Sequence, residues 1–76
     1  RYLGGSHAQR DIIGLTLLEA ALRDGRHELA LALSSERTAL KPTSPQNWRF
    51  AARAHRGLGD HRRAAEAEAR AVALHG

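Results

Sequence analysis

The sequence predicts an all-α fold of two helix–turn–helix hairpins, which together make four antiparallel helices. Three observations predict this fold. Apolar residues recur at helical spacing, and no segment shows the sustained alternation of a half-buried strand. Glycine and proline interrupt the helical pattern at three points. The connections at those points are very short, so consecutive helices must pack as antiparallel neighbours.

The first helix is expected at about 7–23, after an N-terminal tail at 1–6. It follows the stretch "GGSHAQRD" at 4–11, in which Ser6 and Gln9 have the spacing of a capping box. In that motif the two side chains satisfy two backbone N–H groups that the helix leaves without partners. The helix is expected to end at an Asp-Gly pair, where Gly25 can take a left-handed turn.

The second and third helices are separated by a segment that contains proline. The second is expected at about 26–40, because Lys-Pro follows it. The third is expected to open with Ser44 as a capping hydroxyl and Pro45 at its first position, where a missing N–H costs little. It is expected to end near Gly57.

The fourth helix is expected to start after Asp60 and to run to about His75. The Asp60 carboxylate would cap its first turn. Glu66 and Arg70 are four residues apart, so we expect an ion pair between them on the helix surface.

Composition limits the classes of protein to consider. The 76 residues allow one small domain with a thin core, since much of the apolar content is alanine. There is no cysteine for disulfides or thiolate metal sites. No apolar run is long enough to span a bilayer or to act as a signal peptide, which favours a cytoplasmic location and no membrane partner.

The charge is +4 with a sequence pI near 11.1, and arginine supplies almost all of the basic residues. A basic balance favours anionic partners such as nucleic acid or acidic peptides. The alternative is that arginine- and alanine-rich composition reflects codon usage, and we favour that interpretation because net charge alone does not define a site.

The chain repeats itself weakly with a period of 34 residues. Both glycine-containing turns within the hairpins match, as do small and apolar helix positions. The identical pairs are Ala20/Ala54, Gly25/Gly59, His27/His61, Ala30/Ala64, Ala39/Ala73 and Leu40/Leu74. A helix–turn–helix unit with this period resembles the tetratricopeptide repeat.

The resemblance divides the chain into a first hairpin at 7–44 and a second at 45–76. The second fits better, with Trp48 near its start and His55 where the pattern prefers tyrosine. In the first, Gly14 replaces the tryptophan and Arg37 stands where a small alanine is usual. These are packing positions, so the match implies a fold and no chemistry.

Residues 4–44 also resemble the C-terminal region of the tetratricopeptide repeat protein 38 family. The stretches "GGSHAQRD", "TLLEAAL" and "ERTALKP" carry this resemblance. It implies that the chain is part of a longer helical repeat protein, a family in which no reaction is firmly assigned.

One candidate chemical site lies in the opening motif. On a helix, His7, Arg10 and Asp11 fall within one turn, a placement that suits acid–base work or metal ligation. One histidine and one carboxylate are too few ligands, however, and Asp11 also suits a helix start by itself. We therefore expect a structural role for this motif, which comprises Ser6, His7, Gln9, Arg10 and Asp11.

The remaining histidines give no metal site, because none are paired at the four-residue spacing of a zinc-binding helix. The repeated pair His27 and His61 is expected to serve the same packing role in both hairpins. No nucleophile–base arrangement or phosphate-binding loop is present. The sequence therefore predicts no cofactor, no metal and no enzymatic activity, with an enzyme site near His7 as the weakest alternative.

The first helix is apolar on two sides. One stripe contains Ile12, Leu15, Leu18 and Leu22, and a second contains Ile13, Leu17, Ala20 and Ala21. A helix that is apolar on nearly all sides is buried on more than one side. Either a homodimer interface formed by the first stripe or a missing neighbouring repeat would cover what the other three helices leave exposed.

The third helix carries Arg49, Arg53 and Arg56 on one face, and Arg23 ends the first helix. In a tetratricopeptide stack this face would line the concave groove, where the four arginines would bind an acidic segment or a free C-terminus. A simple solvated face explains the stripe equally well.

These observations favour a protein–protein interaction module that binds a peptide or partner helix in its groove. The alternative is a basic helical module that binds nucleic acid or another polyanion, which would show a steep salt dependence.

Overall fold

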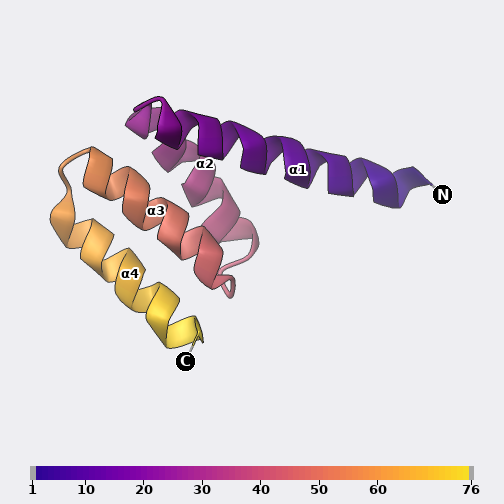
Figure 1. The fold of residues 1–76 in the computed structure, drawn as a ribbon. Coiled ribbons are helices and arrows are strands. Elements are labelled where there is room, and N and C mark those ends of the chain that lie inside the picture. Colours follow the sequence, from indigo (N-terminus) through magenta and orange to yellow (C-terminus); the bar gives the residue numbers. More distant parts are fainter. Residues whose placement is uncertain (1, 76) are drawn as a thin grey trace.

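The computed structural model describes the backbone of residues 2–75 and the side chains of residues 12–75. All regular elements in that part are helices: α1 (Tyr2–Arg23), α2 (His27–Leu40), α3 (Pro45–Gly57) and α4 (His61–His75). Each helix packs on the next in antiparallel fashion, and α3 joins the two hairpins by lying against α2 (Figure 1). The predicted all-α fold of helical hairpins is confirmed.

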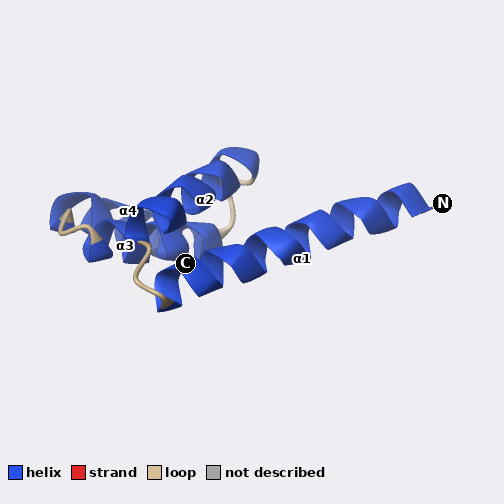
Figure 2. Cartoon of the chain, turned by 90° about the horizontal axis from the view of Figure 1, so that it is seen from above, coloured by secondary structure: helices blue, strands red, loops and turns tan. Residues whose placement is uncertain are grey.

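The start of α1 differs from the prediction. The helix begins at Tyr2 instead of His7, so residues 2–6 are helical and do not form a tail. Ser6 therefore lies within the helix and not at the N-cap position before it. The side chains of Ser6 and Gln9 lie outside the described residues. As Figure 2 shows, the N-terminal part of α1 projects beyond the other helices.

The turns within the two hairpins are alike. Gly25 has φ 76° and Gly59 has φ 81°, in the left-handed region that glycine enters at little cost. In both turns the residue after the glycine donates its backbone N–H to a carbonyl five residues earlier, at 2.8 and 2.9 Å. These bonds satisfy carbonyls that the helix end leaves free, as the predicted glycine turns require.

Only one of the two predicted side-chain caps is present. Asp60 Oδ1 accepts the backbone N–H of Arg63 at 3.2 Å, which confirms its capping role. Ser44 is the N-cap of α3, but its hydroxyl makes no capping hydrogen bond. Pro45 at the first position has no N–H, so one fewer donor there needs a partner.

The predicted ion pair between Glu66 and Arg70 is wrong. Glu66 Oε2 lies 3.6 Å from Arg62 Nε, one turn earlier on α4. The Arg70 guanidinium instead lies over the indole of Trp48, 4.9 Å from the ring centroid. The aromatic face on α3 attracts the cation across the hairpin.

Two clusters form the core. The larger joins the C-terminal half of α1 to α2 and α3, and its buried members are Leu18, Ala21, Leu22, Ala30, Phe50 and Ala54. The second holds α3 against α4 through Ala51, Ala52 and Ala67, with Trp48 packed beside them. Because the second cluster is mostly alanine, α3 and α4 approach closely and leave little apolar bulk between them.

A polar contact joins the two hairpins. The Asn47 amide, which is 4 % exposed, donates to the carbonyls of Arg37 and Lys41 at 3.2 and 3.4 Å. Its oxygen accepts a hydrogen bond from Arg37 Nε at 3.1 Å. Asn47 therefore occupies carbonyls at the end of α2 that would otherwise lack partners.

The departures from the repeat pattern at Gly14 and Arg37 compensate for each other. A Cβ placed on Gly14 would lie 3.8 Å from Arg37 Nη1, so the long side chain passes beside the glycine. The second hairpin has Trp48 and Ala71 at the equivalent positions, with the large residue on the other helix.

Candidate functional site

The apolar stripes of α1 are covered differently from the prediction. Leu18 and Leu22 are buried within the chain, and Leu15 packs partly against the same cluster, so these three do not form an open interface. Their contacts with α2 and α3 explain the difference. The exposed apolar residues of α1 are Ile12, Ile13 and Leu17, whose exposed fractions are 63 %, 59 % and 53 %. We call these three residues the α1 face.

The repeat explains why the α1 face is open. Ile13 and Leu17 precede Asn47 and Ala51 by 34 residues, and both of those α3 residues are buried. The part of α3 that carries Asn47 packs on the preceding helix α2, whereas no described helix covers the same side of α1. Thr16, between them, donates its hydroxyl to the Ile12 carbonyl at 2.8 Å, so it needs no partner from outside.

The four arginines of the predicted groove do not act as one cluster. Arg49 and Arg53 are exposed on α3, and neither is paired with any described residue. Arg56 Nη2 is 3.1 Å from Glu68 Oε2 on α4. Arg23 Nε is 3.6 Å from the carboxylate of Asp24 next to it. Two exposed arginines thus remain free on this face.

His27 and His61 have different surroundings, contrary to the prediction. The His27 ring lies against the α carbon of Gly57, where a Cβ would overlap its Nδ1 and Cγ atoms. His27 Nδ1 is buried and has no hydrogen-bond partner. His61 is exposed at the start of α4. No described helix lies against α4 as α3 lies against α2, so His61 has no counterpart of Gly57 to contact.

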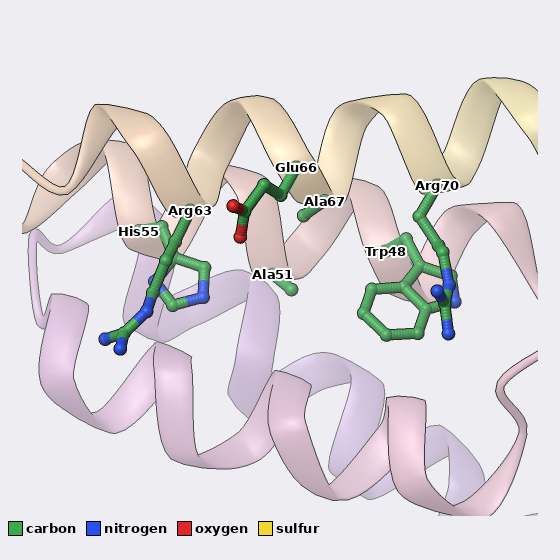
Figure 3. A pocket seen from close by; sticks show the side chains of 7 residues that line it. All are labelled: Trp48, Ala51, His55, Arg63, Glu66, Ala67 and Arg70. Atoms are coloured by element: carbon green, nitrogen blue, oxygen red, sulfur yellow. The ribbon is translucent and has the colours of Figure 1, made fainter.

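A hollow of about 290 Å³ lies on the second hairpin, and sequence reasoning missed it. Ala51 and Ala67 form its floor, with His55 and Arg63 at one end and Trp48 and Arg70 at the other (Figure 3). Glu66 lies on α4 between the two ends. The signal that points to it is a size change in the repeat: the positions of Ala51 and Ala67 correspond to Leu17 and Leu33 in the first hairpin.

The structure does not describe the side chains of the opening motif, so the arrangement of Ser6, His7, Gln9, Arg10 and Asp11 lies outside the described residues. Among the side chains that are described, no group of three or more histidine or carboxylate residues is placed to hold a metal ion. Within the same part of the chain, no helix has the length and apolar character needed to cross a bilayer.

Comparison with known proteins gives no family assignment. No protein-family model matches the chain, and no solved structure matches it significantly. The class that the fold defines is therefore an all-α protein of two packed helical hairpins, and its function must be argued from its own surfaces.

Proposed function

We propose that the chain is a protein–protein interaction module that contacts a partner helix through the α1 face. The observation that carries this proposal is the exposure of Ile12, Ile13 and Leu17 on a helix whose other side is packed. Exposed apolar residues grouped on one face are typical of an interface. A cytoplasmic location remains part of the proposal.

The occupant that we propose is a second copy of the chain. The α1 face contains no polar group that needs a specific partner, since the Thr16 hydroxyl is bonded within its own helix. Two copies related by a two-fold axis would present Ile13 to Leu17 of the other copy, and the reverse, which is the geometry of a self-complementary interface. The projection of this part of α1 beyond the hairpins leaves room for such a pairing (Figure 2).

Head-to-tail stacking of copies is disfavoured by one residue. The contact between the two hairpins requires glycine at position 57, where the His27 ring lies. The equivalent residue of α1 is Arg23, 34 residues earlier, and its side chain would meet His61 of another copy. Both can carry positive charge, so this arrangement has steric and electrostatic costs that the two-fold pairing avoids.

Sedimentation velocity over a range of concentrations tests the proposal. We expect the wild type to self-associate and the Ile13→Ser/Leu17→Ser variant to remain monomeric. Leu40→Ser is the matched control, because Leu40 is 82 % exposed but lies at the end of α2, away from the α1 face. Identical sedimentation of the wild type and the double variant would contradict the proposed role of the face.

A further inference from the structure

The hollow on the second hairpin has the size of a side-chain pocket. Its volume of about 290 Å³ is at the lower end of the range for small-molecule sites. It is open to solvent, and its floor consists of Ala51 and Ala67, each 5 % exposed. A site of this size and depth suits one or two apolar side chains of a peptide.

The repeat indicates which kind of side chain fits. The first hairpin has Leu17 and Leu33 where the second has Ala51 and Ala67. Leu33 packs against the core of its own hairpin, while the shorter Ala67 ends at the floor of the hollow. The second hairpin thus lacks the branched carbons that its counterpart supplies, and a leucine from a partner would replace them.

Trp48 makes one wall of the hollow rigid. Its Nε1 donates to the Pro42 carbonyl at 2.8 Å, which fixes the indole plane. Arg70 covers one part of the ring, with its guanidinium 4.9 Å from the centroid. An immobilised aromatic wall loses little conformational entropy when a ligand packs against it.

Charge at the two ends of the hollow favours an acidic ligand. Arg63 and His55 lie at one end and Arg70 at the other (Figure 3). The Arg63 side chain is 69 % exposed, and although Nη1 is 3.4 Å from Asp60 Oδ2, the guanidinium has further N–H donors. No described carboxylate pairs with Arg70, so its donors are also open to a ligand.

Glu66 opposes this preference in part. It also lines the hollow, and its carboxylate is 64 % exposed and 3.6 Å from Arg62 Nε. The lining therefore contains two guanidinium groups and one carboxylate that is already paired. The balance of charge remains positive, and removal of the Glu66 charge should increase it.

We propose that this hollow binds a short acidic peptide segment, with a leucine-sized side chain on the alanine floor and flanking carboxylates at Arg63 and Arg70. It is a second contact site, separate from the α1 face, and it gives the module a chemically defined partner. The proposal does not depend on self-association.

Fluorescence titration tests this proposal directly, because Trp48 is the single tryptophan of the chain. The probe is a capped pentapeptide with one leucine between two aspartates on each side. We expect a saturable change in Trp48 emission with the wild type, at least tenfold weaker binding after Ala67→Leu, and weaker binding after Arg70→Gln. Glu66→Gln should bind several-fold more tightly.

Ala69→Leu is the matched control, because it makes the same change at an exposed position of α4 outside the hollow. It should bind as the wild type does. Circular dichroism melting checks that each variant folds, and Ala51→Leu replaces Ala67→Leu if the latter does not. The Ile13→Ser/Leu17→Ser variant should also bind normally, which separates this site from the α1 face.

Three results would overturn the proposal. The first is no change in Trp48 emission at millimolar peptide. The second is equal binding by the wild type and Ala67→Leu. The third is equal binding of peptides in which leucine is replaced by alanine, or tighter binding of an oligothymidylate under the same salt conditions, since either indicates a general polyanion site.

Discussion

Gly57 is the residue at which the two hairpins approach most closely. The His27 ring occupies the space that a Cβ on Gly57 would fill. Gly57→Ala should therefore destabilise the chain by about 1–3 kcal/mol, as overpacked sites do, despite the higher helix propensity of alanine. Chemical denaturation monitored by circular dichroism measures this change in the free energy of unfolding.

Gly14→Ala is the control at the other interior glycine of a described helix segment. A Cβ there would only reach ordinary contact with Arg37 Nη1 at 3.8 Å, so we expect stabilisation by up to about 1 kcal/mol. Adding His27→Ala to Gly57→Ala should restore most of the lost stability. Additive effects of those two substitutions would show that the ring and the glycine do not interact.

The residues that sequence reasoning placed correctly are those with local requirements. Gly25 and Gly59 were predicted because a positive φ is a property of the turn itself. The contact of His27 with Gly57 joins residues 30 positions apart, and the stacking of Arg70 on Trp48 joins residues 22 apart. Such contacts depend on how the helices pack, which the local sequence does not specify.

At the scale of the helices, the caps of α3 and α4 give a direct comparison. Asp60 accepts the N–H of Arg63 at 3.2 Å, whereas the Ser44 hydroxyl makes no capping bond. Asp60→Ala should lower the free energy of unfolding by about 1 kcal/mol, and Ser44→Ala should change it much less. Equal losses in thermal or chemical melts would mean that the bond at Asp60 contributes little to α4.

The bounds of α2, α3 and α4 lie within about one residue of those predicted, since proline and glycine mark the ends of these helices. The start of α1 was wrong because the capping motif and the glycines at 4 and 5 both favour a later start. The helix instead continues through these glycines, each of which costs about 1 kcal/mol relative to alanine.

At the scale of the whole molecule, the chain contains two hairpins that pack well on each other and leave two surfaces unfilled. The sequence predicted an exposed apolar side of α1 but assigned it to Leu15, Leu18 and Leu22, which the other helices cover. Helical periodicity identifies both stripes, but only the packed structure decides which stripe faces α2 and α3. The hollow on the second hairpin was not predicted, because it depends on what two alanines on different helices leave between them.

The most direct test of the central claim, that the α1 face contacts a second copy, is methyl NMR as a function of protein concentration. We predict that the methyl resonances of Ile12, Ile13 and Leu17 shift together on concentration, while those of Leu18, which is fully buried, and Leu40 do not. Resonances of the α1 face that stay constant from micromolar to millimolar protein, or shifts of equal size at Leu40, would contradict the claim.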